Sequence, residues 1–258
     1  SFAKSNKVFT RTTEVSVGEA VAMARSFAEN GCHAVLVMTT ATFSFEKFAR
    51  SVAAIREALP PETPLIANVG DAYADHADEM RSLGICGVYH AVRLGEGKDT
   101  AILPRRRLDS MEKFRGAGLQ LGTCVEPIGP EHSNREIAEM IRFTADLEPV
   151  FSGAARRIPL PGTSMGALGT IPEIRLAQVV AITRLAMPHS TVANCAHEPG
   201  TLVAMGGASF FWAEMGANPR DTKEKTEEGR AHNVKELAAM FWETDWRLRR
   251  GSSRIWLA

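Results

Sequence analysis

The feature that most constrains the fold is the regular alternation of short apolar runs with amphipathic helical patterns. Strand-like runs are predicted at 33–40, 65–69, 85–92, 119–126, 151–160, 191–196 and 209–214. Helices are predicted at 17–28, 45–59, 72–83, 104–115, 134–147, 171–186, 201–205 and 234–248. Ser16 with Glu19 and Ser133 with Glu136 have the spacing of helix capping boxes. Strands separated by helices indicate parallel pairing with right-handed crossovers.

The number of strand–helix units indicates a barrel that lacks its beginning. We count seven units, whereas a closed (β/α)8 barrel needs eight, and the first recognisable element after Ser1 is a helix. We therefore predict one α/β domain over residues 1–258, a TIM-type (β/α)8 barrel without its first strand. The charged segment 219–229 is expected to be a loop, and residues from about 230 to 258 a terminal helix and tail.

Composition excludes several classes of protein. The 258 residues carry 30 basic and 30 acidic side chains, so no basic surplus suggests nucleic acid. No apolar run reaches the ~18 residues of a membrane span, and nothing reads as a signal peptide. The four cysteines are widely separated and lack CxxC spacing, so we expect reduced thiols, no local metal site and a cytoplasmic protein.

Polar side chains collect where the predicted strands end, which is where barrel enzymes hold their active sites. These residues are Thr39, Thr40, Thr42, Asn68, Asp71, His90, Arg93, Glu96, Lys98, Glu126, Glu131, Arg156, Arg157, Asn194, His197, Glu198, Trp212, Glu214 and Asn218. Guanidinium groups suit a carboxylate, and carboxylates suit an ammonium or hydroxyl group. The pattern therefore favours a small zwitterionic or polyfunctional ligand.

Each of these residues also has a simpler interpretation. Lys98, Glu131 and Glu198 read equally as solvated loop residues, and His90 as a satisfied core histidine. Glu126 is the strongest candidate because it ends an apolar strand and Pro127 restricts its backbone.

Two other enzyme classes receive little support. Gly206 and Gly207 could approach a phosphate, but no GxGxxG or GxxxxGK[ST] motif accompanies them, and glycine pairs are common in close packing. No GxSxG elbow is present, which argues against a serine hydrolase.

Five stretches resemble the biotin-synthase-like branch of the radical S-adenosylmethionine (SAM) enzymes. They are RLGEGKDT (93–100), CVEPIGPEH (124–132), RRIPLPGTS (156–164), RLAQVVAITRLAMP (175–188) and FWAEMGANPRDT (211–222). This branch includes biotin synthase, the maturase HydE, methylornithine synthase PylB and the [Fe]-hydrogenase cofactor maturase HmdB. The stretches look most like HmdB and PylB.

The resemblance implies a radical SAM barrel. A [4Fe–4S] cluster reduces SAM, and the 5′-deoxyadenosyl radical then abstracts hydrogen from a small substrate, which also requires an electron donor. The family's C-x-x-x-C-x-x-C cluster loop is absent from this sequence, and its ligands are expected upstream of Ser1. The chain alone would then be inactive.

The resemblance also implies residue roles, position by position. SAM contacts are expected from Thr39, Thr40, Arg93, Glu96, Glu126, Ile158 and Pro159. Substrate contacts are expected from Asn68, His90, Arg157, Asn194, His197 and Trp212. The family's acidic residue near Thr39 is missing, because the run here is MTTAT.

Several functions remain open within and beyond this branch. Biotin synthase itself fits poorly, because Val37 and Ile66 stand near two of its auxiliary-cluster cysteines and only Cys124 is near a third. Cofactor maturation of the HmdB type is the leading expectation, followed by a methylornithine-type rearrangement. A barrel that binds SAM or a metabolite without catalysis, and a phosphate-binding barrel enzyme, are the alternatives.

Overall fold

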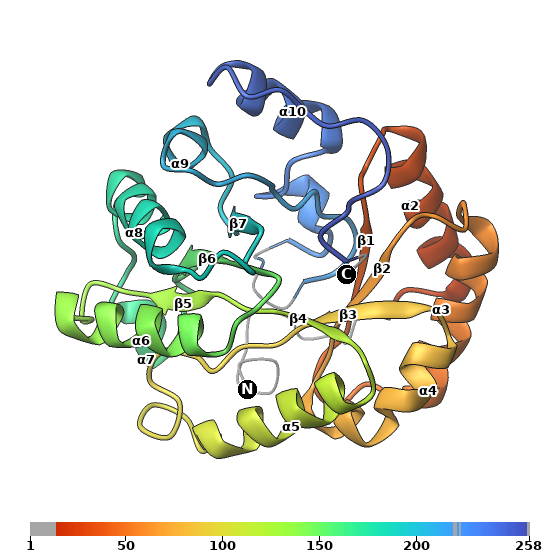
Figure 1. The fold of residues 1–258 in the computed structure, drawn as a ribbon, viewed down its shortest axis with the longest axis horizontal. Coiled ribbons are helices and arrows are strands. Elements are labelled where there is room, and N and C mark those ends of the chain that lie inside the picture. Colours follow the sequence, from red (N-terminus) through yellow and green to blue (C-terminus); the bar gives the residue numbers. More distant parts are fainter. Residues whose placement is uncertain (1–13, 219–220, 222, 257–258) are drawn as a thin grey trace. The chain divides into compact units, whose positions relative to one another are not determined.

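The structure is a computed structural model that describes residues 14–218, 221 and 223–256. The chain forms two compact units. The amino-terminal unit contains residues 15–122 and 249–256, and the carboxyl-terminal unit contains residues 123–248. Each unit is a parallel sheet with helices beside it (Figure 1).

The amino-terminal unit is built on four parallel strands in chain order. They are β1 (Val35–Met38), β2 (Leu65–Asn68), β3 (Ile85–Tyr89) and β4 (Gln120–Gly122). The helices between them are α2 (Val17–Glu29), α3 (Phe45–Ala58), the 3₁₀ helix η1 (Asp71–His76), α4 (Ala77–Ser82) and α5 (Pro104–Gly116). This order confirms the predicted strand–helix alternation and its parallel pairing.

Helical periodicity explains how these helices meet the sheet. In α3, Phe48, Val52 and Ile55 are buried at steps of four and three residues, which places them on one face. The capping box predicted at Ser16 is present, because its hydroxyl accepts from the Glu19 amide and Glu19 accepts from the Ser16 amide. The predicted helix at 72–83 is instead a 3₁₀ turn followed by a short α-helix.

The segment 249–256 completes the amino-terminal unit from the far end of the sequence. The Ser253 amide donates to the His33 carbonyl oxygen, which just precedes β1. Trp256 is only 5 % exposed, and its ring packs so closely on Gly87 of β3 that any side chain at position 87 would overlap it. The tail is therefore a core element of this unit.

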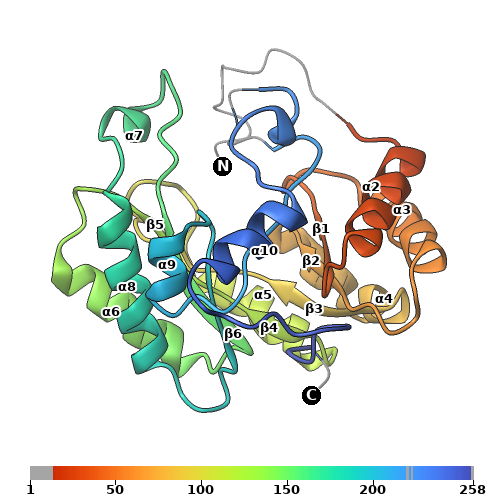
Figure 2. The same cartoon turned by 90° about the horizontal axis from the view of Figure 1, so that it is seen from above.

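The carboxyl-terminal unit has a central strand with a parallel neighbour on each side. The central strand is β6 (Phe151–Arg156), and its neighbours are β5 (Val125–Ile128) and β7 (Ala193–Ala196). Its helices are α6 (Asn134–Asp146), α7 (Ser164–Ala167), α8 (Glu173–Ala186), α9 (Thr201–Met205), the 3₁₀ turn η2 (Thr226–Glu228) and α10 (Val234–Trp242). Helices α6 and α8 lie side by side along this sheet (Figure 2).

Three more predicted elements differ from the structure. The run 119–126 is divided into β4 and β5, and the predicted strand at 209–214 is reduced to a single bridge from Phe210 to Cys195. There Phe211 stacks on Phe241 of α10 with ring centroids 4.4 Å apart, so side-chain packing replaces strand pairing. Helix α10 ends at Trp242 rather than at 248, because Asp245 adopts a left-handed conformation and the Trp246 amide bonds back to Phe241.

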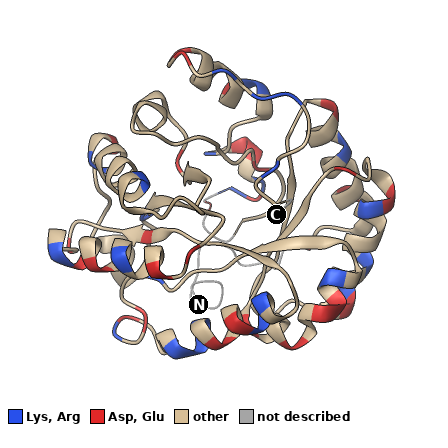
Figure 3. Ribbon diagram, viewed as in Figure 1, with Lys and Arg blue, Asp and Glu red and all other residues tan. Residues whose placement is uncertain are grey.

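Charged residues belong mainly to the helices, and the strands contain almost none (Figure 3). Strand β2 and strand β6 are buried along nearly their whole length, as expected for parallel strands in an α/β fold. Within the part of the chain that is described, no helix has both the length and the apolar character that a membrane crossing requires.

Candidate functional site

A buried cluster of charged residues follows strands β2 and β3 of the amino-terminal unit. His90 Nε2 lies 2.9 Å from Asp71 Oδ1, and Arg107 Nη1 donates to Asp71 Oδ2 at 2.7 Å. Arg107 also donates to Glu96 Oε1, from Nε at 3.0 Å and from Nη2 at 2.9 Å. One arginine thus joins two carboxylates, and we call these four residues the arginine cluster.

The surroundings fix the ionisation of this cluster. Burial opposes charge on Asp71, but the hydrogen bond from His90 and the charge of Arg107 hold the pKa of Asp71 below its ordinary value. Burial lowers the pKa of His90, and Arg107 adds to that shift while Asp71 opposes it. The cluster therefore contains an ionised Asp71 beside a His90 that is neutral at pH 7.

Six residues that the sequence predicted as ligand contacts lie in this unit. Thr39 and Thr40 directly follow β1, and Asn68 ends β2 with its carbonyl oxygen accepting from the Thr39 amide at 3.0 Å. His90 is 4 % exposed and bonds to Asp71, so its observed contacts are those of the satisfied core histidine.

Arg93 and Glu96 have different environments although both follow β3. The side chain of Glu96 is 3 % exposed, and its oxygens accept from Arg107 and from the Arg93 amide at 3.1 Å. The Arg93 side chain is 32 % exposed. Arg93 is therefore the residue of this pair that a ligand can reach, whereas Glu96 positions the backbone of Arg93.

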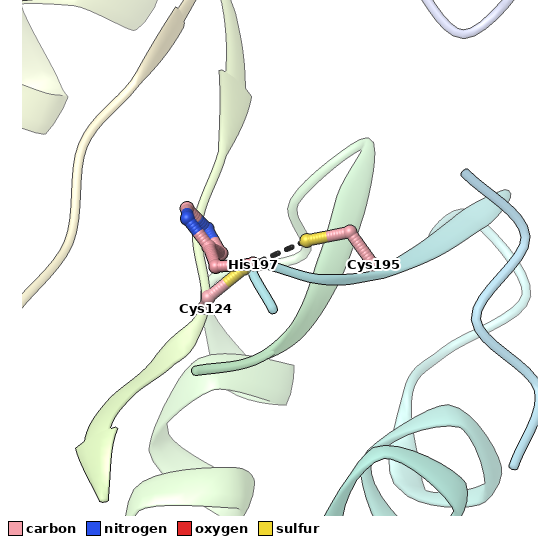
Figure 4. Close-up of side chains that lie close together, drawn as sticks. All are labelled: Cys124, Cys195 and His197. Atoms are coloured by element: carbon pink, nitrogen blue, oxygen red, sulfur yellow. Dashed lines mark hydrogen bonds between the residues drawn. The ribbon is translucent and has the colours of Figure 1, made fainter. Parts of the chain in front are cut away.

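Two thiols and one imidazole meet in the carboxyl-terminal unit (Figure 4). Cys124 Sγ lies 3.2 Å from Cys195 Sγ, and these sulfurs and a ring nitrogen of His197 all lie within 4.8 Å of one another. We call these three residues the thiol–imidazole cluster. Both cysteines are buried, and the His197 side chain is 10 % exposed.

Strand register explains why residues 71 positions apart come together. Val125 pairs with Ala154 of β6, and Cys195 pairs with Gly153. Cys195 thus lies in the strand on one side of β6, and Cys124 directly precedes the strand on the other side. A Cβ at Gly153 would overlap the Cys195 carbonyl oxygen and lie 2.7 Å from its carbonyl carbon.

Alternation along the strands selects which residues join the cluster. Residues i and i+2 share a face, so Cys124 lies with Glu126 and Cys195 with His197. Glu126 Oε2 is 4.0 Å from His197 Nε2, which agrees with a common face. Asn194 has the opposite orientation, and its amide donates to the carbonyl oxygens of Val180 in α8 and Gly207 at 3.1 and 3.2 Å. The substrate contact of Asn194 stays a prediction.

The other residues of this unit that the sequence predicted as ligand contacts are Trp212, Arg157, Ile158 and Pro159. Trp212 approaches His197 with ring centroids 6.4 Å apart and packs edge-on against Phe151. Arg157 is 6 % exposed and forms a two-point ion pair with Glu131, with one bond of 2.9 Å. This pair lowers the pKa of Glu131 to about 2. Ile158 and Pro159 follow β6; Ile158 is half-buried and Pro159 is exposed.

The thiol of Cys124 has a strongly shifted ionisation. Burial raises the pKa of Cys124 well above its ordinary value, the neighbouring Cys195 raises it further, and His197 opposes the shift. The Cys124 thiol is therefore protonated at neutral pH unless a cation binds beside it. Sulfur and imidazole donors on one face of a sheet suit a thiophilic metal ion or a soft electrophile.

The sequence predicted part of this geometry and missed the rest. It singled out Glu126, His197 and Trp212 as ligand contacts, and the structure brings these three side chains into one region, while their contacts with a ligand stay a prediction. It missed Cys124, Cys195 and Arg107 as site residues, because wide separation in sequence was taken as separation in space. The usable signal was the spacing C-x-E at 124–126 and C-x-H at 195–197, at the ends of two predicted strands.

The chain is similar in sequence to several biotin synthases. No family model matches the chain. The chain is 28% identical over 143 residues to the biotin synthase of Parafrankia sp. (strain EAN1pec), covering 54% of the chain and 39% of that protein. It is 23% identical over 155 residues to the biotin synthase of Sulfurihydrogenibium sp. (strain YO3AOP1), covering 58% and 45%. The matched region spans less than half the length of these relatives.

Solved structures give the fold. The crystal structure of methylornithine synthase (PylB) matches with a TM-score of 0.72 at 12% identity, over 97% of the chain and 77% of PylB. The 3-dehydroquinate dehydratase of Enterococcus faecalis matches with a TM-score of 0.55 at 12% identity, over 92% of each chain. The predicted α/β fold class is thereby confirmed. Sequence and fold together confirm that the chain resembles the biotin-synthase-like branch of the radical SAM enzymes.

Proposed function

We propose that the chain is the main part of a radical SAM enzyme that acts on a small metabolite. The observation that carries this proposal is the agreement of sequence and fold on one branch, with biotin synthases as sequence relatives and PylB as the structural neighbour. Fold alone hosts many chemistries, so the sequence relatives are needed to favour this one.

The described residues do not fit the family's [4Fe–4S] cluster. Such a cluster needs three convergent cysteine thiolates, with SAM on the remaining iron. Of the four cysteines, all within the described residues, only Cys124 and Cys195 come together. We therefore expect the cluster ligands elsewhere in the protein, in a C-x-x-x-C-x-x-C loop. When bound to that cluster, SAM supplies the radical that abstracts hydrogen from the substrate.

The residues of the amino-terminal unit fit the recognition of an amino acid moiety. The partly exposed Arg93 can hold a carboxylate, and the arginine cluster keeps the Arg93 backbone in place through Glu96. Thr39 and Thr40 directly follow β1, and each carries a hydroxyl group. We propose that these three residues contact SAM.

The residues of the carboxyl-terminal unit could bind a polar ligand and pack an aromatic side chain against it. Glu126 can accept from an ammonium or hydroxyl group, and Trp212 can cover an apolar part of the ligand. Ile158 and Pro159 provide exposed apolar surface next to β6. Holding the reacting C–H bond in a fixed place, sheltered from water, is what such residues contribute to radical chemistry.

Within the branch, we propose cofactor maturation of the HmdB type, acting in the cytoplasm with a reducing electron donor. The five sequence stretches favour this subgroup, and a methylornithine-type rearrangement is the second candidate because PylB shares the fold. Sulfur insertion is disfavoured, because Val37 and Ile66 are not cysteines.

The test uses the full-length protein after anaerobic cluster reconstitution. We expect it to bind SAM and to release 5′-deoxyadenosine on reduction. Glu126→Gln should weaken the binding of SAM or substrate while the protein remains folded, whereas Glu139→Gln, an exposed change in α6 of the same unit, should not. A full-length protein without a C-x-x-x-C-x-x-C loop that neither binds nor cleaves SAM would refute the proposal.

A further inference from the structure

We propose that Cys124, Cys195 and His197 form a mononuclear binding site for a thiophilic divalent metal ion, with Zn²⁺ as the ion that fits best (Figure 4). Two sulfur donors and one imidazole are a combination that selects zinc over the hard cations magnesium and calcium. The inference concerns this chain's own residues and holds whether or not the proposed radical function is correct.

The distances match a tetrahedral ion after a small adjustment. Two sulfurs at the usual zinc–sulfur length of ~2.3 Å are separated by about 3.8 Å across a tetrahedral angle. The observed Sγ–Sγ distance is 3.2 Å, so the thiols need to part by only about half an ångström. The imidazole nitrogen already lies within 4.8 Å of both sulfurs.

The two cysteines approach each other across β6. Cys195 lies in β7 and Cys124 directly precedes β5, and both of these strands pair with β6. Their sulfurs lie 3.2 Å apart, and both thiols are free. A metal ion can bind between them after a small movement of the side chains, whereas a disulfide would need the sulfurs to approach to about 2.05 Å.

The surroundings of the three donors have the features of a built metal site. Cys124 and Cys195 are 1 % and 0 % exposed. Cys195 lies within β7, and Cys124 directly precedes β5. Glu126, 4.0 Å from His197 Nε2, can orient the imidazole as carboxylates do beside metal-bound histidines. Gly153 allows the backbone of Cys195 to approach β6 closely.

The donor count indicates what the ion could do. Structural zinc sites use four protein ligands, whereas catalytic sites use three and leave one position for water or substrate. Three donors are present here, and Trp212 lies beyond His197. The fourth position would then accept a thiol, carboxylate or hydroxyl group of a small molecule.

The site can be tested with Co²⁺ and Zn²⁺ on the reduced full-length protein. We expect one ion more than the cluster loop accounts for, and a thiolate-to-cobalt charge-transfer absorption that Zn²⁺ abolishes. Cys124→Ser, Cys195→Ser and His197→Gln should each lose this ion. Glu126→Gln should lower the affinity by about 10- to 100-fold. Cys86→Ser, a half-buried cysteine that donates to Leu65, is the control and should keep the ion.

Folding and alternative occupants are checked separately. Zn²⁺ should raise the melting temperature of the wild type and of Cys86→Ser, but not of a folded Cys124→Ser or Cys195→Ser variant. Metal binding that persists in both of these variants would overturn the site. Two outcomes would overturn the assignment of a single metal ion. One is iron with sulfide bound by these residues, and the other is a Cys124–Cys195 disulfide that forms under mild oxidant in the presence of Zn²⁺.

Discussion

Replacement of Gly153 by alanine tests the packing that brings the two thiols together. Gly153 has φ = +151°, a conformation that residues with side chains rarely adopt, and a Cβ there would overlap the Cys195 backbone. Such backbone strain costs about 1–3 kcal/mol, and overpacking adds about 1–3 kcal/mol. We therefore expect Gly153→Ala to lower the free energy of unfolding by roughly 4 kcal/mol.

The assay is thermal unfolding followed by circular dichroism. A loss of 4 kcal/mol corresponds to a fall in melting temperature of roughly 10 °C for a protein of this size. Gly162→Ala is the matched control, because Gly162 also has a positive φ of +77° but no atom lies within 4 Å of its Cβ. It should show the backbone cost alone, about 1–2 kcal/mol. Equal melting temperatures for the two variants would refute the argument that the Cys195 backbone closes this space.

Three further predictions concern side chains that are buried or form ion pairs. Arg107→Met removes the buried guanidinium that Asp71 and Glu96 share and leaves only the more exposed Arg106 and Arg93 near them, so it should cost about 3–5 kcal/mol in urea unfolding. Arg105→Met, with a 75 % exposed side chain, should cost less than about 1 kcal/mol. The pKa of Glu131 is lowered from 4.5 to about 2. The ion pair of Glu131 therefore stabilises the protein fully above pH 4.5, and this contribution is lost as the pH falls towards 2. Arg157→Gln should remove this part of the pH dependence of stability. Trp256→Ala should cost about 3–5 kcal/mol, measured as a shift of the denaturation midpoint.

Local sequence signals predicted the elements well. The capping boxes at Ser16 and Ser133 mark real helix starts, because their hydrogen bonds involve residues three positions apart. The segment 209–214 was wrongly predicted as a strand, because its apolar residues Phe210, Phe211 and Trp212 pack in aromatic contacts rather than in a ladder. An apolar composition does not distinguish a β-strand from a segment whose aromatic side chains pack together without strand pairing.

Site geometry was less predictable because it depends on register across strands. Glu126 and His197 were recognised from their positions at strand ends. The pairing of Cys124 with Cys195 requires knowing that β6 lies between their strands and that Gly153 stands opposite Cys195. The role of Arg107 depends on how α5 lies against the 3₁₀ turn at Asp71, which no local pattern encodes.

The tail at 249–256 has a consequence for the order in which the protein matures. The core around Gly87 of the amino-terminal unit stays unfinished until Trp256 has been synthesised, because that ring fills the space above the glycine. During translation this unit must wait, partly open, while more than a hundred later residues leave the ribosome. A nascent chain stalled before residue 249 would therefore expose this half of the protein to proteases and chaperones, although every strand of its sheet had already been made.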